Sequence, residues 1–256
     1  MTLPFARARF ALALGLALFS GLASLQAADV EGIIAKARAY LGPDAALNGI
    51  QSIQYTGKLA VFEGVGKEPK ISDIPVEIIF QKPFRQRIMA SFPNRAETTV
   101  LDGYDAWQYI QDAVKPSVWK LDLMLKDATK RLRANTWENL AFYRGLEKQG
   151  GQIEDLGDVS VDGVVCRKLA FRHEPGIVFV RYFEKATGHL IVSETEQGST
   201  IREEGEIMVN GIRFPKKVIT TSRRADGTQN SIVVTFDKIT VNGKIDDQLF
   251  AMPAPR

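Results

Sequence analysis

Five turn dipeptides, each lying between runs of alternating apolar and polar residues, constrain the fold of this chain more than any other feature. They are Asp102-Gly103, Asp162-Gly163, Thr187-Gly188, Asn210-Gly211 and Asp226-Gly227. Such pairs favour the tight turns of β-hairpins, so the strands on either side of each turn are expected to be antiparallel neighbours. The chain shows no regular alternation of strands with helices, which argues against a parallel sheet.

The alternating runs extend from Ile53 to Val241 and predict about ten or eleven strands. Together with two helical segments they predict an α+β fold, a strongly curved antiparallel sheet with helices covering its concave face. An open half-barrel and a closed barrel both remain compatible with the pattern, since either can present a concave apolar face.

The first helical segment is predicted from Asp29 to Leu41. Asp29 is its expected N-cap, and Gly42-Pro43 ends it. Its apolar stripe consists of Val30, Ile33, Ile34, Ala37 and Leu41. A helix this short needs a sheet on which to pack.

The longest run with helical spacing, Val118 to Gln149, predicts two consecutive helices. One apolar face of the first helix is formed by Leu121, Met124, Leu125, Ala128 and Leu132. In the second, Asn135 is the expected N-cap, Glu138 completes a variant of the capping box, and Gly150-Gly151 ends the helix. Trp119 to Leu123 also alternates like a strand, which leaves a later start for the first helix open.

The second of these helices carries apolar side chains almost all the way round. They are Trp137, Leu140, Ala141, Phe142, Tyr143 and Leu146. A helix of this kind has to be covered on more than one side. We expect the helical pair to lie across the concave face, with one side on the sheet and the other over an apolar space. The alternative is that both helices fill the core and leave no cavity.

The first residues are typical of a secretory signal peptide. Arg7 and Arg9 precede an apolar run from Phe10 to Leu25, and small residues follow at Ala27 and Ala28. We therefore expect residues 1–27 to be removed and residues 28–256 to form a single exported domain. Loss of Arg7 and Arg9 reduces the 33 basic residues to 31, against 30 acidic ones. This balance argues against nucleic acid as a partner.

Patterns of enzymes and metal sites are absent from the expected mature sequence. It has no G-x-S-x-G, H-E-x-x-H or C-x-x-C motif, and His173 and His189 lack metal-ligand spacing. Glu203 and Glu204 are adjacent, so in a strand they point to opposite faces and cannot form a catalytic pair. The single cysteine, Cys166, excludes an intramolecular disulfide and is expected to be a buried small apolar residue. We expect no catalytic residue, metal or cofactor.

Apolar side chains near the helical segment remain as candidates for a ligand-binding cavity, although rings in strands are more often core than ligand site. These candidates are Phe80, Trp107, Tyr109, Trp119, Leu121, Met124, Leu125, Trp137, Leu140, Phe142 and Leu146.

Several turn and packing motifs resemble those of the bacterial outer-membrane lipoprotein-sorting superfamily, the LolA/LolB-like carriers and their relatives. They are Asp102 to Trp107, Val161 to Leu169, Thr187 to Leu190, Val209 to Pro215 and Leu249 to Pro253. The resemblance implies a curved antiparallel half-barrel whose mouth is plugged by helices and whose cavity takes acyl chains of lipoproteins. No binding residue of the carriers can be matched to a position of this chain.

The resemblance implies a periplasmic carrier that binds an acyl chain, lipid or lipoprotein, with an inner- or outer-membrane protein as a further partner. Burial of an acyl chain supplies about 0.8 kcal/mol per methylene, so such a carrier needs a movable lid and no catalytic groups. The alternative is a non-enzymatic periplasmic scaffold or envelope-assembly protein with a filled core and a surface that binds a protein.

Overall fold

The computed structural model describes residues 19–64, 68–174, 176–224 and 226–253, with side chains described from Asp29 onward. Most of the expected signal peptide, residues 1–18, lies outside the described residues.

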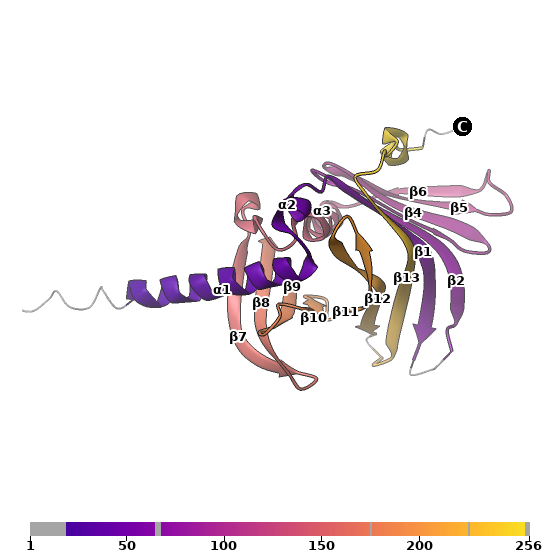
Figure 1. Ribbon diagram of the computed structural model, residues 1–256. Helices are drawn as coiled ribbons and strands as arrows, with labels where there is room; N and C mark the ends of the chain where they lie inside the picture. Colours follow the sequence, from indigo (N-terminus) through magenta and orange to yellow (C-terminus); the bar gives the residue numbers. More distant parts are fainter. Residues whose placement is uncertain (1–18, 65–67, 175, 225, 254–256) are drawn as a thin grey trace, which may run out of the picture.

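One antiparallel sheet of 13 strands dominates the fold (Figure 1). The strands are β1 (Ser52–Glu63), β2 (Ile71–Gln81), β3 (Arg85–Ser91), β4 (Arg95–Asp102), β5 (Asp105–Asp112), β6 (Trp119–Leu123), β7 (Gln152–Val161), β8 (Val164–Glu174), β9 (Ile177–Glu184), β10 (Leu190–Thr195), β11 (Thr200–Val209), β12 (Ile212–Arg223) and β13 (Gln229–Val241). Their order is β6-β5-β4-β3-β2-β1-β13-β12-β11-β10-β9-β8-β7. With β6 and β7 as its edges, the sheet is an open, curved half-barrel rather than a closed barrel.

The sheet consists of two meanders, β1 to β6 and β7 to β13, which are joined by the pairing of β1 with β13. This pairing runs from Ile53 opposite Val241 to Glu63 opposite Asn230. The five predicted turns all connect antiparallel neighbours. At Asn210 and Gly211 the φ angles are 53° and 77°, the paired positive values that a tight hairpin turn requires. Local turn chemistry therefore predicted the meander correctly.

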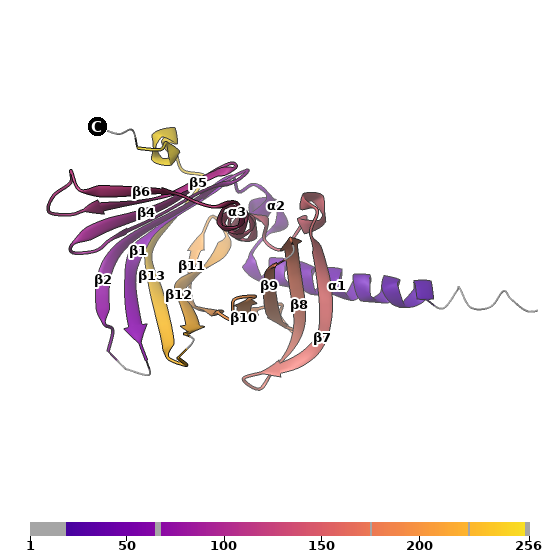
Figure 2. The same cartoon turned by 180° about the vertical axis from the view of Figure 1, so that it is seen from behind.

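The described residues form five helical segments beside the sheet. They are α1 (Phe19–Leu41), α2 (Asp44–Asn48), α3 (Lys126–Ala141) and the 3-10 turns η1 (Leu146–Gln149) and η2 (Asp247–Phe250). Both views of the molecule show α2 and α3 between the two wings of the curved sheet (Figures 1 and 2). Among the residues that the structure describes, no helix combines the length and the apolar character needed to cross a bilayer.

The prediction of two helices between Val118 and Gln149 is wrong. Trp119–Leu123 is strand β6, which pairs with β5 and places Trp119 opposite Gln111. The alternation of these residues therefore outweighs their helical spacing. A single helix, α3, then runs through Asn135, which is not an N-cap. The strand count predicted from sequence is too low, in part because β6 was assigned to a helix.

α3 also ends earlier than predicted. Phe142 and Tyr143 adopt left-handed backbone conformations, with φ of 48° and 72°, and η1 follows them. Such values are uncommon for large side chains and need support from the surrounding structure. Arg38 of α1 supplies it: the buried guanidinium donates from Nη1 to the carbonyl oxygen of Phe142 at 2.9 Å. The same guanidinium donates to Asp44 Oδ1 at 2.7 Å and Asn48 Oδ1 at 2.8 Å.

The first predicted helix is present but longer than expected. α1 begins at Phe19, so Asp29 lies inside the helix and does not cap it. The preceding residues are mostly Ala, Leu and other tolerated helix formers, which explains the extension. Its predicted stripe is confirmed, because Ile33, Ile34 and Ala37 are buried against β8 and β9.

Three apolar clusters position the helix α3 and the C-terminal segment. On one wing, Trp137 of α3 packs with α1, β8 and β9. On the other, Leu140 and Phe142 pack with α2, β1, β2, β12 and β13. A third cluster lies on the outer face of the sheet, where Phe250 of η2 covers Ile79, Val100 and Trp107. α3 therefore bridges the wings rather than lying on one of them.

Candidate functional site: a cavity under the central helix

A cavity of about 330 Å³ lies between α3 and the concave face of the sheet. The helix lines it with Asn135, Glu138 and Asn139, which share one face because they are three and four residues apart. The expectation of an apolar helix face over this space is met only after the helix ends, where Phe142 and Tyr143 line the cavity. Within α3, Trp137 and Leu140 pack on the wings, and polar side chains face the hollow.

One side of the cavity is apolar and is built by β1, β2 and β13. Its main side chains are Tyr55, Ile78, Phe80, Val234 and Phe236. The ring of Tyr55 lies 4.7 Å from that of Phe236 and 6.3 Å, edge to face, from that of Phe80. The alternation predicted from sequence places these residues on one face, as half-buried strands require.

The opposite side, built by β9 to β11, carries buried charges. Arg181 of β9 forms an ion pair with Glu138 of α3, whose other carboxylate oxygen lies 2.6 Å from His173 Nε2. All three side chains are at least nine-tenths buried. The guanidinium carbon of Arg181 also lies 4.7 Å from the centre of the Phe171 ring and 5.2 Å from that of Tyr143. Aromatic rings and Glu138 together hold this cation in place.

Glu203 of β11 reaches into the same cavity. Its side chain is exposed to the hollow but surrounded by protein, and this enclosure raises the pKa of its carboxyl, with the nearby charge of Arg181 acting in the opposite direction. Within the described part of the chain, its carboxylate has neither an ion pair nor a hydrogen bond. Glu204, the next residue, points outward as expected and pairs with Lys217 at 2.8 Å.

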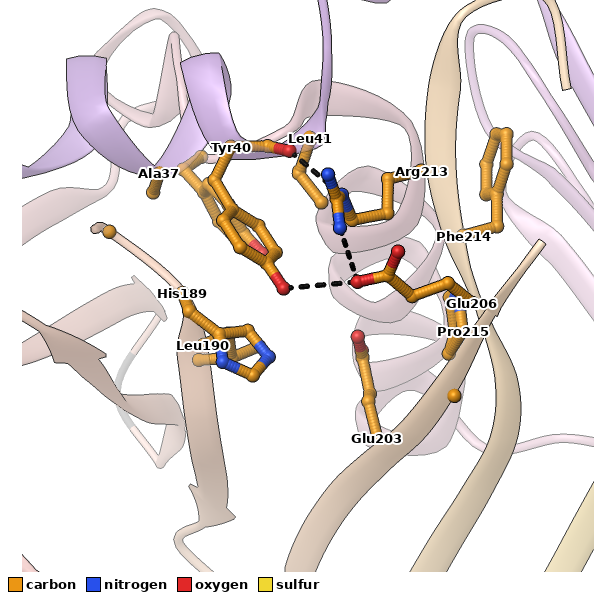
Figure 3. Close-up of a pocket in the computed structure, with 13 residues that line it drawn as sticks. Ala37, Tyr40, Leu41, His189, Leu190, Glu203, Glu206, Arg213, Phe214 and Pro215 are labelled. Atoms are coloured by element: carbon orange, nitrogen blue, oxygen red, sulfur yellow. Dashed lines mark hydrogen bonds and ion pairs between the residues drawn. The ribbon is translucent and has the colours of Figure 1, made fainter. Parts of the chain in front are cut away.

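A smaller hollow of about 160 Å³ adjoins the cavity and shares Glu203 and Arg213 with it (Figure 3). At this rim the Tyr40 hydroxyl donates to Glu206 Oε1 at 3.2 Å, and Arg213 pairs with the same carboxylate. The His189 ring stacks on Tyr40 at 4.7 Å. The two histidines thus have different positions, His173 buried and His189 at the rim, and neither lies in a group of side chains able to hold a metal among the described residues.

The structure separates the side chains that sequence analysis had grouped into one site. Phe80 and Phe142 line the cavity. Trp137, Leu140 and Leu146 are buried in the flanking clusters.

The remaining candidates lie away from the cavity. Trp107, Tyr109 and Leu121 belong to the outer cluster under η2, because Ile79 of that cluster and Phe80 of the cavity are adjacent in β2 and point to opposite faces. Trp119 is 41% exposed beside Tyr109, Leu125 is 83% exposed, and Met124 is half-buried in the segment before α3.

Sequence analysis missed the charged side chains Glu138, Arg181 and Glu203. A signal for Arg181 was present, because strand alternation puts it on the same face as Phe179 and Phe183, where an apolar residue is expected. A charge at an inward position of a strand indicates a partner or a ligand. Glu138 could not be recognised because its position also fits a capping box.

No protein-family model matches the chain, and no curated protein is significantly similar to it in sequence. Solved structures are similar in fold. A LolA superfamily protein from Nitrosomonas europaea superposes with a TM-score of 0.56 at 13% identity, covering 87% of this chain and 97% of its own. The chain therefore shares its fold with this LolA superfamily protein.

Two further structures agree. A putative outer membrane lipoprotein-sorting protein domain from Vibrio parahaemolyticus has a TM-score of 0.53 at 10% identity, covering 86% of this chain and 97% of its own. A DUF1329 family protein from Desulfovibrio piger has a TM-score of 0.55 at 10% identity, with 87% and 97% coverage. These likenesses confirm the resemblance at the level of fold, and function has to be argued from the cavity.

Proposed function

We propose that this chain is a non-enzymatic carrier that binds the acyl chain of a lipid or lipoprotein in the cavity under α3. The observation that supports this best is the hollow itself, which has one apolar side of packed rings and lies under a helix held at both wings. A concave, mostly apolar space with a few convergent polar groups is the usual form of a small-molecule site.

The size of the cavity limits what it holds in this arrangement. Its volume of about 330 Å³ is near the lower end of the range for small-molecule sites, ~300 to 1,000 Å³. It therefore suits a single short chain, and ten buried methylenes would contribute about 8 kcal/mol before the cost of ordering them. A longer chain, or a lipoprotein with several chains, requires α3 to move away from one wing.

Location and partners belong to the same proposal. Residues 1–27 act as a signal peptide, and residues 28–256 form a single periplasmic domain that takes part in outer-membrane envelope biogenesis. Transfer of a lipid or lipoprotein then needs a donor or acceptor protein in the inner or outer membrane. N-terminal sequencing of the protein from a periplasmic fraction tests the cleavage, and retention of residue 1 would contradict it.

Binding of a neutral fluorescent probe, N-phenylnaphthylamine, tests the carrier function directly. The unaltered protein should bind the probe, and Phe80→Ala should weaken binding by about ten-fold or more because it removes part of the apolar side. Trp107→Ala is the matched control: it removes a buried ring from the outer face and should lower stability while leaving probe affinity unchanged. Absence of probe binding, or equal loss in both variants, would refute the carrier function.

A scaffold that binds a protein is the second candidate, and one observation favours it. Exposed apolar side chains gather around the edge strand β6, namely Val118, Trp119, Leu123 and Leu125. An edge strand with free backbone groups and apolar side chains can receive an added strand from a partner. Native mass spectrometry of protein from its own periplasm separates the candidates: a co-purifying lipid supports the carrier, and a bound protein without lipid supports the scaffold.

A further inference from the structure

The cavity contains one carboxylate whose charge is not compensated by a direct partner. Of the charged groups that line it, Glu138 and Arg181 pair with each other, and Arg213 pairs with Glu206 at the rim. Glu203 has no ion pair or hydrogen bond with any described residue. An unpaired carboxylate that lines a cavity is free to pair with a ligand that brings a cation or a hydrogen-bond donor.

Two tyrosines line the same cavity as Glu203, namely Tyr55 and Tyr143. Burial, and next the negative charge of Glu203, raise the pKa of both hydroxyl groups. Neither hydroxyl is hydrogen-bonded within the described part of the chain. The cavity is therefore lined by one carboxylate and two phenol groups that are free to bind a ligand.

The guanidinium of Arg181, near Glu203, does not make the cavity a binding site for anions. Arg181 is nine-tenths buried, already pairs with Glu138, and has its Nε buried without a hydrogen-bond partner among the described residues. A phosphate or carboxylate placed against its free face would come close to the negative charges of Glu203 and Glu138. An ammonium group carries a positive charge and three donors, which suit the unpaired carboxylate of Glu203.

We propose that the ligand of this cavity is an amphiphile with an ammonium head group, which pairs with Glu203 while its tail lies against Phe80 and Phe236. The inference rests on the proposed carrier function and names the class of head group that the same cavity selects. The tyrosine rings add an attraction for the cation, and the apolar side contributes affinity in proportion to the buried tail.

Competition with N-phenylnaphthylamine at neutral pH tests this with three ligands that share one tail: dodecylamine, dodecanol and dodecanoate. Dodecylamine should bind at least about ten-fold more tightly than dodecanol, and dodecanoate most weakly, because a charge-assisted hydrogen bond outweighs a neutral one. Equal affinities, or tightest binding of dodecanoate, would overturn the proposal while leaving the carrier function intact. If none of the three displaces the probe, the carrier function and this inference both fail.

The variant Glu203→Gln sharpens the test. It should reduce the affinity for dodecylamine by about ten-fold and leave that for dodecanol nearly unchanged. Glu204→Gln is the matched control, since it makes the same change at the next residue, which points outward to Lys217. Equal dodecylamine affinities in the Glu203 variant and the unaltered protein would overturn the proposal. If that variant does not fold, the ranking of the three ligands on the unaltered protein decides.

Discussion

The two sides of the cavity are built on different physical principles. The side formed by β1, β2 and β13 presents packed rings such as Tyr55, Phe80 and Phe236, whereas the side formed by β9 to β11 presents Arg181 and Glu203. Apolar area contributes affinity without regard to the identity of the tail. Buried charges contribute little net stability but discriminate strongly between head groups. In the proposed carrier, affinity and selectivity therefore reside in opposite walls of one hollow.

The largest expected effect on stability comes from removing one partner of the ion pair on the charged side of the cavity. Arg181→Met should destabilise the protein by about 3 to 5 kcal/mol, because Glu138 is then left as a buried charge beside His173 alone. Urea denaturation followed by circular dichroism measures this. The double variant Arg181→Met with Glu138→Met should recover most of the loss, since no unpaired charge remains. A single variant that loses less than about 1 kcal/mol would show that the pair is not buried in solution.

The next largest effect on stability distinguishes the packed face of α3 from its cavity face. Leu140→Ala removes a buried side chain from the β1 wing and should cost about 2 to 4 kcal/mol. Asn139→Ala, its neighbour on the cavity face, loses the hydrogen bonds to the carbonyl oxygen and Oδ1 of Asn135 and should change stability by less than about 1 kcal/mol. Equal losses in thermal unfolding would contradict the division of this helix into a packed face and a cavity face.

A substitution of Cys166 tests whether changes outside the cavity leave ligand binding unaffected. It is fully buried with Tyr182 and Val192 in a separate cluster, and burial raises the pKa of its thiol, as expected for a small apolar residue rather than a reactive one. Cys166→Ser should lower the free energy of unfolding by about 1 to 2 kcal/mol without changing ligand affinity. Loss of binding at full stability would reveal a role for the thiol.

The smallest effect has the opposite sign. Glu203→Gln should raise stability slightly near neutral pH, because it removes a carboxylate whose ionised form the folded state disfavours. The pKa of Glu203 is raised, so its ionisation destabilises the folded state increasingly above the pKa of the unfolded chain, about 4.3, and fully above the raised value. The gain should therefore vanish below about pH 4, where both states are protonated. A gain that persists there would assign the effect to packing instead.

The fold was largely predictable because its determinants are local. The pairs Asp162-Gly163 and Asn210-Gly211 adopt the turn conformations that their chemistry favours, and alternation assigns faces to the strands that they connect. The helix boundaries were less predictable. Asn135 and Glu138 fit a capping box but are the cavity face of a continuous helix, and that helix ends at Phe142, whose carbonyl oxygen accepts a hydrogen bond from the distant Arg38.

The sequence by itself determined the antiparallel meander, the buried stripe of α1 and the apolar character of the strands, since each depends on residues a few positions apart. The tertiary structure alone decided which apolar side chains surround a cavity, as shown by Phe80 facing it and Trp107 lying on the outer face. It also brought Glu138, Arg181 and Glu203 together from α3, β9 and β11. Charges so far apart in sequence interact only after the sheet has curved and α3 has closed over it, because electrostatic contact depends on distance in space.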